Sequence, residues 1–413
     1  MHRGMGLLAV VMTSAVLAGC NGALMPQGEW SGLVHPDVLA KAGLKYYWTA
    51  RVPLLVGERV RSIYRLDEKV YCLTTSNRLL AVDAMTGDYK WAFEVAEPGE
   101  TVFRPVNFDN VALTPNTSGI GEILSPRRLP SVTPVPAVML NTLTGVVVIN
   151  RTTGEAIRRP GNIVLQDADV ANTAGTTDGY NYYVAAPNGQ YYAVRLQEGV
   201  KVWSMFTSSE PIMAPLVFNN GHLYITNEGG GVYCTAVGRK GRQEWNHRLD
   251  GPVVGGIYVD DRGCFIPCMD HRIYAYNPLT GEKLWDPFIC DGQLQQAIQV
   301  GENSVFQYAD QDKFYCLDVA TGRLRWPAIR DGRMVLSVIG GNLYVRDGRN
   351  NLLVLDEMLG SRKMSVPMTG HEMFVGNATA PVMYSGRADG RLFCIAPATL
   401  SHLTMDVLKG KKK

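Results

Sequence analysis

The chain has 413 residues, of which 46 % are hydrophobic and 19 % charged, so it holds enough apolar residues for a sizeable core. Its 40 lysines and arginines against 38 aspartates and glutamates leave a net charge of +2, which excludes the strongly basic surface of a nucleic-acid-binding protein. A mean hydropathy of −0.04 excludes a polytopic membrane protein. The 43 glycines and 22 prolines indicate many turns, and we expect a soluble all-β fold.

Residues 1–19 are typical of a lipoprotein signal peptide. The apolar run Met5–Ala18 is short for a transmembrane helix but fits the core of a signal sequence. It runs into Leu-Ala-Gly-Cys at 17–20, which resembles the lipobox of bacterial lipoproteins. That resemblance implies that Cys20 is acylated and becomes the mature N-terminus, and Asn21 in place of Asp favours the outer membrane. The alternative is an ordinary signal peptide with an accidental cysteine.

The segment 20–44 is predicted to be a lipidated tether. At most one helical turn is expected in it, near Pro36–Ala42, and Gly43 ends that turn. Trp48 follows in the segment YYWTARVPL, which belongs to no complete repeat.

A repeat organises the rest of the chain. AVDAMTGDYKW (81–91), AYNPLTGEKLW (275–285) and CLDVATGRLRW (316–326) are its clearest copies. The shared glycine recurs at positions 87, 154, 199, 241, 281, 322 and 360. Four residues after each glycine stand Trp91, Arg158, Trp203, Trp245, Trp285, Trp326 and Met364. The steps between these positions are 38–45 residues, except for a first step of 67, which indicates an insertion at about 115–135.

Each unit predicts four short strands, which is the blade of a β-propeller. The repeat glycine falls between the third and fourth strands, where a tight turn requires positive φ. The tryptophan then falls on the outer strand and is expected to pack against the neighbouring blade. This structural role is predicted for Trp48, Trp91, Trp203, Trp245, Trp285 and Trp326.

The last unit, residues 385–397, lacks an outer strand. We expect the Trp48 strand to supply it and so to close the ring. The alternative is residues 398–409, although Leu400, Leu403, Val407 and Leu408 also fit one face of a helix that Gly410 ends. The sequence therefore predicts an all-β, eight-bladed propeller of four-stranded antiparallel blades over 45–397, closed by an N-terminal strand and followed by a C-terminal tail, 398–413.

The tandem Asp-x-x-Thr-Gly-x-x-x-Trp motif resembles the quinoprotein-type, or pyrroloquinoline-quinone-like, propeller repeat. A lipobox followed by eight such units resembles the BamB-like family of outer-membrane assembly lipoproteins. This resemblance covers residues 45–397 and implies a non-catalytic scaffold on the periplasmic face of the outer membrane. Its partner would be the β-barrel assembly machinery or the unfolded clients of that machinery, which sheet-edge addition could bind.

A quinoprotein dehydrogenase is the competing interpretation, since such enzymes carry the same repeat. By resemblance, they need a tryptophan beneath the quinone, acidic Ca²⁺ ligands and, in several cases, adjacent cysteines. Here six of the seven tryptophans are assigned to the repeat role, Trp30 lies in the tether, and no Cys-Cys pair occurs. We therefore expect no cofactor, no metal and no enzymatic activity. A third possibility is a polysaccharide- or peptide-binding propeller of another envelope complex.

Other reactive residues fit structural roles. Apart from Cys20, seven cysteines remain, and we expect buried free thiols, with one disulfide that involves Cys290 as the alternative. His271 and His371 are expected in surface turns, because no nucleophile motif accompanies them.

One set of turns has the character of a binding surface. The predicted turns between second and third strands place several arginines on one rim, and arginine is enriched at interface hot spots. These candidates for partner binding are Arg78, Arg272, Arg346, Arg349, Arg387 and Arg391. Solvated turns are the alternative. The insertion at 115–135 shares this rim if residues 110–114 form the second strand of its blade, and leaves from the opposite face if residues 137–141 do.

Overall fold

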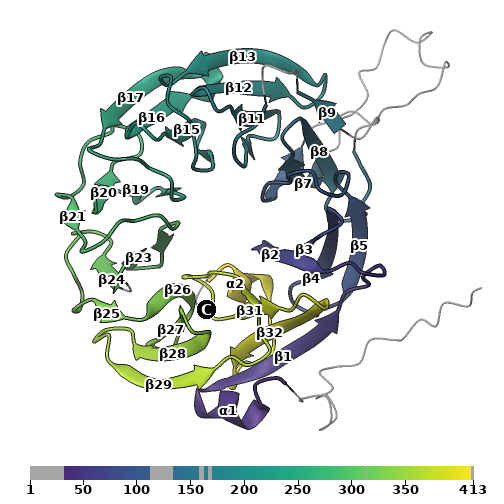
Figure 1. Cartoon of the computed structure of the whole chain (residues 1–413), viewed down its shortest axis with the longest axis vertical. Coiled ribbons are helices and arrows are strands. Elements are labelled where there is room, and N and C mark those ends of the chain that lie inside the picture. The colour runs from purple at the N-terminus through teal and green to yellow at the C-terminus, as the bar shows by residue number, and fades with distance from the viewer. Residues whose placement is uncertain (1–31, 112–133, 158–161, 166–169, 312, 411–413) are drawn as a thin grey trace, which may run out of the picture. The chain divides into compact units, whose positions relative to one another are not determined.

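The computed structural model describes residues 32–111, 134–157, 162–165, 170–311 and 313–410. These residues form eight four-stranded antiparallel sheets that stand as blades around a central axis (Figure 1). This confirms the predicted eight-bladed β-propeller. The helical elements of the described chain are α1 (Pro36–Lys41), α2 (Met405–Leu408) and one 3-10 turn, Val237–Arg239. None of these helices has the length and apolarity that a membrane-spanning segment needs.

We number the blades in chain order, from the inner strand outwards. Blade 1 contains β2 (Val60–Leu66), β3 (Lys69–Thr74), β4 (Arg78–Asp83) and β5 (Tyr89–Glu94). Blade 2 contains β6 (Val106–Val111), β7 (Val135–Asn141), β8 (Gly145–Asn150) and β9 (Asn162–Val164). Blade 3 contains β10 (Thr176–Thr177), β11 (Asn181–Ala185), β12 (Gln190–Arg195) and β13 (Val200–Phe206). Blade 4 contains β14 (Val217–Asn219), β15 (His222–Thr226), β16 (Gly231–Ala236) and β17 (Arg242–Arg248).

The second half of the ring repeats this order. Blade 5 contains β18 (Tyr258–Asp260), β19 (Gly263–Pro267), β20 (Arg272–Tyr276) and β21 (Phe288–Ile289). Blade 6 contains β22 (Gln299–Val300), β23 (Ser304–Ala309), β24 (Lys313–Asp318) and β25 (Ile329–Arg330). Blade 7 contains β26 (Gly332–Ile339), β27 (Asn342–Asp347), β28 (Asn351–Asp356) and β29 (Arg362–Pro367). Blade 8 contains β30 (Met373–Phe374), β31 (Met383–Gly386), β32 (Arg391–Pro397) and β1 (Leu44–Arg51).

Blade 8 joins the two ends of the ring. Its outer strand is β1, which runs antiparallel to β32 and places Trp48 opposite Cys394. The predicted closure by the N-terminal strand is therefore confirmed. Residues after β32 instead form α2, and Leu403 and Leu408 on this segment are buried against the core between blades 8 and 1.

The core lies between successive blades. The second and third strands of a blade are buried on both faces, as in β3, where all six residues are buried. The outer strand faces solvent, as in β5, where Trp91 is the one buried residue. This difference follows from stacking, because each inner strand is covered by blades on both sides whereas the outer strand lies on the rim of the disc.

Each repeat tryptophan packs on the repeat glycine of the next blade. A Cβ on that glycine would lie less than 3.0 Å from the indole or its Cβ, and each glycine has positive φ. The pairs are Trp48 with Gly87, Trp91 with Gly154, Trp203 with Gly241, Trp245 with Gly281, Trp285 with Gly322, and Trp326 with Gly360. The glycine thus serves two purposes, since it turns the chain and leaves room for the ring.

Blades 5 and 6 depart from the predicted strand pattern. Trp285 and Trp326 were expected on continuous outer strands, but Trp285 lies between an isolated bridge at Lys283 and the two-residue strand β21. Pro287 and Pro327 follow the two tryptophans, and a proline cannot donate a ladder hydrogen bond. The outer edge of these blades is consequently interrupted.

The insertion in blade 2 joins the inner strand β6 to the second strand β7. Residues 137–141 therefore belong to the second strand, and the insertion leaves from the face opposite the turns between second and third strands. Residues 112–133, which include most of the insertion, lie outside the described residues, as do Cys20 and Trp30.

Candidate functional site

The six candidate arginines all lie at turns that join the second and third strands of a blade. Arg78, Arg272 and Arg391 begin a third strand, whereas Arg346, Arg349 and Arg387 lie at the end of a second strand or in the turn. Since every blade has the same strand order around the ring, these turns lie on one face, which we name the arginine face. Five of the six arginines belong to blades 7, 8 and 1, which are consecutive in the ring (Figure 1). Arg272 stands apart in blade 5.

Arg78 is held by a buried carboxylate. Its Nη1 donates to Oε2 of Glu58 over 2.7 Å, and the Glu58 side chain is 1 % exposed. Burial alone would raise the pKa of Glu58, but hydrogen bonds from the Leu55 amide and the Thr74 hydroxyl, together with Arg78, lower it. The pair therefore fixes the loop before β2 to the start of β4.

Arg387 and Arg391 share one carboxylate. Asp389 lies 3.3 Å from Nε of Arg387 and 2.9 Å from Nη2 of Arg391. Burial would raise the pKa of Asp389, and its contacts with Arg391 and Arg387 lower it overall. Glu372 lies 4.0 Å from Arg387 and accepts from the Ala388 N–H, so two carboxylates balance the two guanidinium groups at this turn.

Arg346 and Arg349 differ in how far neighbouring residues hold their side chains. The guanidinium of Arg346 lies 5.0 Å from the ring centre of Phe374 in blade 8, and its Nε donates to Asn350. Burial lowers the pKa of Arg346, and neighbouring Asp347 partly offsets this. Arg349 is exposed, and its contact within the described chain is the hydrogen bond from its backbone N–H to Asp347.

Arg272 is neutralised within its own part of the ring. Its Nη1 lies 2.8 Å from Asp250 and 3.1 Å from Asp270. The structure thus brings Arg387 and Arg391 together, places Arg346 against blade 8, and leaves Arg272 separate from the other arginines.

The motif search missed an apolar tip beside these arginines. The loop between β1 and β2 exposes 57 % of Leu55 and 107 % of Val56, and Val56 is the most exposed of the large apolar residues described. Val52 at the base of the loop donates to the Gly390 carbonyl, which places the loop beside the turn of Arg387 and Arg391. The sequence signal was the run Pro-Leu-Leu-Val-Gly outside the repeat, which no strand pattern explained.

The chemistry of the arginine face is complementary to an acidic and partly apolar protein surface. Guanidinium groups pair with carboxylates, and an exposed apolar tip provides the desolvated contact that dominates many interfaces. Most of these arginines already hold an internal partner, so they are oriented before a partner arrives.

The tryptophans and cysteines weighed for redox chemistry take positions inside the blades and between them. The six repeat tryptophans cover glycines of neighbouring blades and thus face blade interfaces. Within the described ranges, no group of three or more His, Cys, Asp or Glu side chains could hold a metal ion. The seven cysteines other than Cys20 are buried and free, and burial raises their pKa values, for example that of Cys72 to about 12.

The surface position predicted for His371 is wrong, because its side chain is 1 % exposed. Its Nε2 lies 3.0 Å from the Tyr46 hydroxyl on β1, and its Nδ1 lies 2.7 Å from the Ser385 hydroxyl on β31. Since the Tyr46 hydroxyl donates to the Val34 carbonyl, Nε2 carries the proton of the neutral ring and Nδ1 accepts from Ser385. Burial, and then the charge of Arg387, lower the pKa of His371 to about 4. His271, by contrast, lies in a turn and is partly exposed.

Comparison with known proteins agrees with the fold. A family model described as "Outer membrane protein assembly factor BamB" matches residues 187–288 and 269–409, together more than half of the chain. No curated protein sequence matches. The crystal structure of BamB from Moraxella catarrhalis is 14 % identical, with a TM-score of 0.60 over 87 % of this chain and 99 % of that one. The computationally designed Ika8 protein is 13 % identical, with a TM-score of 0.59 over 84 % and 98 %. At these identities, the structural likeness concerns the fold alone.

Proposed function

This chain belongs to the family described as outer membrane protein assembly factor BamB, and from that premise we propose that it is a non-catalytic protein-binding scaffold in the assembly of outer-membrane β-barrel proteins. The observation that carries the proposal is the clustering of oriented arginines over blades 7, 8 and 1 beside the exposed tip at Leu55 and Val56. A propeller suits this role, because its turns present a wide surface on a rigid frame.

The proposed location is the periplasmic face of the outer membrane. The lipobox at residues 17–20 supports acylation of Cys20, and the predicted tether, 20–44, contains α1 and leads into β1. Lipid attachment would hold the disc near the membrane without a spanning segment. Cys20→Ala should release the protein from membranes, and fractionation of cell envelopes measures this. Membrane attachment that survives the substitution would contradict the lipid anchor.

Affinity capture from solubilised membranes, with mass spectrometry of the co-purified proteins, tests the scaffold role. We expect subunits of the β-barrel assembly machinery to co-purify with the wild-type chain. Val56→Glu and Arg349→Glu change exposed side chains of the arginine face and should reduce this capture. Leu279→Glu is the matched control, since Leu279 is also exposed, at 60 %, but lies on the opposite face.

Three outcomes would overturn the proposal. Capture of a different envelope complex would make the chain a propeller of that complex. If Val56→Glu and Arg349→Glu capture as much of the assembly subunits as the Leu279→Glu control does, the arginine face does not contact the partner. Saturable binding of pyrroloquinoline quinone with Ca²⁺, together with dye-linked oxidation of alcohols or sugars, would make the protein a dehydrogenase.

A further inference from the structure

A cavity of about 490 Å³ opens on the face opposite the arginine face, where blades 6, 7 and 8 meet the C-terminal segment. Its walls are the turns at 301–303 and 340–341, which join first and second strands, and the segment 378–381. Val407 and Gly410 complete the wall on the side of α2. A volume of this size lies within the range of binding pockets for small groups.

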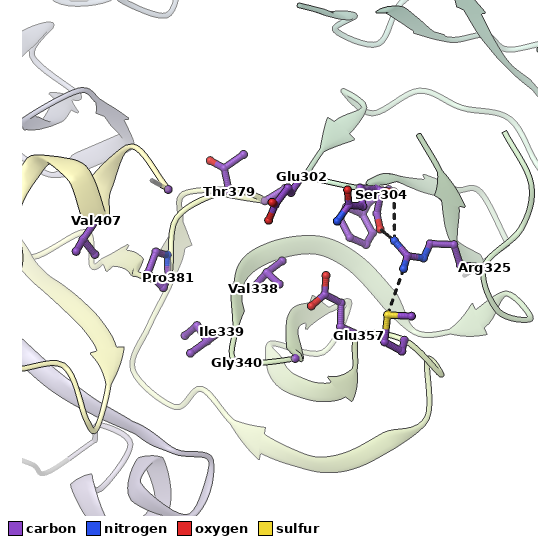
Figure 2. Close-up of a pocket in the computed structure, with 17 residues that line it drawn as sticks. Glu302, Ser304, Arg325, Val338, Ile339, Gly340, Glu357, Thr379, Pro381 and Val407 are labelled. Carbon is purple, nitrogen blue, oxygen red and sulfur yellow. Dashed lines mark hydrogen bonds between the residues drawn. The ribbon is translucent and has the colours of Figure 1, made fainter. Parts of the chain in front are cut away.

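The lining combines apolar walls with a negative charge. Phe306 and Ala378 are buried, and Val338, Ile339 and Pro381 are half-buried. The charged residues of the lining are Glu302, Glu357 and Arg325, so the lining carries two carboxylates and one guanidinium group. Figure 2 shows Glu302 and Glu357 pointing into the same space beside Val338.

Arg325 is already engaged. Its Nη1 donates to the Ser304 hydroxyl over 2.7 Å and to the Asn303 carbonyl over 3.2 Å, while Nη2 contacts Sδ of Met358 over 3.3 Å (Figure 2). These contacts draw the guanidinium to one side of the cavity. Among the described residues, Arg325 forms no ion pair with Glu357.

Glu357 is held in place through its backbone. Its N–H donates to the Gly341 carbonyl over 2.9 Å, and its carbonyl accepts from Nε1 of Trp326 over 3.3 Å. The side chain is half-buried, and among the described residues no cation pairs with its carboxylate. A half-buried carboxylate beside apolar walls is complementary to a cation on an aliphatic stem.

We propose that this cavity binds a lysine or arginine side chain that a partner polypeptide presents between apolar residues. The cationic head pairs with Glu357 and Glu302, and the aliphatic stem lies on Val338. The flanking apolar residues contact Met358, which lines the cavity and is 63 % exposed. This site goes beyond the proposed scaffold role, because it lies on the other face and has its own ligand chemistry.

Short capped peptides test the proposal on the full mature chain. The probe is the N-acetylated, C-amidated tripeptide Leu-Lys-Leu, and its matched partners carry norleucine or glutamate in place of lysine. Calorimetric titration should show binding of the lysine peptide, about tenfold weaker binding of the norleucine peptide, and none of the glutamate peptide. Because Trp326 bonds to the Glu357 carbonyl, the lysine peptide should also change tryptophan fluorescence, and Trp326→Phe should remove most of that change.

Glu357→Gln should weaken binding of the lysine peptide about tenfold and leave the affinity for the norleucine peptide unchanged. Glu282→Gln is the control, because Glu282 is an exposed glutamate in the turn between the third and fourth strands of blade 5, on the same face but outside the cavity. Val338→Phe should fill the cavity and abolish binding of every peptide. Thermal melts of each variant show that a loss of binding is not a loss of fold.

Equal affinities for the lysine and norleucine peptides would overturn the proposal, as would wild-type affinity in Glu357→Gln. Binding that appears only after removal of the lysines at 411–413 would also overturn it, since the occupant would then be the chain's own C-terminus. This test and the scaffold test can fail independently. If the lysine peptide binds but no assembly subunits are captured, the proposed function is wrong and this site stands. If assembly subunits are captured but the lysine peptide does not bind, this site is wrong and the proposed function stands.

Discussion

The indole of Trp48 covers Gly87 in the neighbouring blade, so that a Cβ on Gly87 would lie 2.9 Å from Cδ2 of the ring. The indole N–H also donates to the Ala84 carbonyl over 3.0 Å. The same pair of contacts joins Trp91 to blade 2 and Trp245 to blade 5. The interface between blades 8 and 1 is therefore built like the other blade interfaces, although Trp48 comes from the N-terminal end of the sequence and the other three strands of its blade come from the C-terminal end.

Trp48→Ala should destabilise the protein by about 3–5 kcal/mol, the usual loss for a large buried aromatic side chain. Trp285→Ala should cost a similar amount, because the two residues are 7 % and 8 % exposed. Trp203→Ala is the control, since Trp203 is only half-buried and should cost less. Thermal and denaturant unfolding measure the three losses. A Trp48 variant as stable as the wild type would mean that β1 does not hold the ring closed.

Gly87→Ala separates the two purposes of the repeat glycine. Gly87 and Gly57 have φ of 80° and 79°, so alanine at either position carries the same left-handed strain of about 1 kcal/mol. Only at Gly87 does the new methyl group meet a tryptophan, because nothing lies within 4 Å of a Cβ at Gly57. We expect Gly87→Ala to lower the melting temperature well beyond Gly57→Ala. Equal losses would mean that the packing of Trp48 adds nothing to the requirement for glycine.

The ring could be predicted from the sequence because its requirements are local and recur. A glycine with positive φ and a tryptophan four residues later suffice to mark each blade interface, and the same arithmetic identified Trp48 as the missing copy. The interrupted outer strands of blades 5 and 6 were also open to prediction, since Pro287 and Pro327 stand in them. The strand prediction from the repeat did not take this effect of proline into account.

Features that join distant segments could not be predicted in this way. His371 lies in a turn motif, yet its burial depends on Tyr46, 325 residues away in the sequence. The partner of Arg78 is Glu58, which lies in a loop outside the repeat. The cavity near Glu357 draws on three blades and the C-terminal segment, so no single stretch of sequence carries its signature. Only the closed ring brings such groups together.

The buried thiols should be inert in the folded protein. Burial raises the pKa values of Cys72 and Cys316 to about 12, and the thiolate is the form that reacts. A thiol-specific colorimetric reagent should modify none of the seven described cysteines under native conditions and all seven in denaturant. Ser209→Cys, at an exposed turn, provides a reactive control. Rapid native modification of an original cysteine would contradict the buried environment that blade stacking gives these thiols.

The buried imidazole of His371 should make the blade 8 junction sensitive to acid. Its pKa is about 4 in the folded protein against 6.5 for an ordinary histidine, so the fold favours the neutral ring. Protonation would put a charge into a buried site and turn Nδ1 from acceptor to donor, which breaks its acceptance of the Ser385 hydroxyl proton. Above pH 6.5 neither state binds the proton and the stability is fully present. As the pH falls from 6.5 towards 4, the His371 imidazole binds a proton in the unfolded chain but not in the folded chain. The free energy of unfolding therefore falls by about 3 kcal/mol.

Urea unfolding at about pH 7.5 and about pH 5 measures this loss. Other groups also titrate in that window, so the informative quantity is the difference between the wild type and His371→Phe. The phenylalanine variant leaves Tyr46 and Ser385 without their ring partner and should be less stable at neutral pH. It should lose less stability than the wild type on acidification. His402→Gln replaces an exposed histidine and should keep the wild-type pH dependence. If His371→Phe and the wild type lose equal stability between the two pH values, the imidazole does not titrate in the way its burial beside Tyr46 requires.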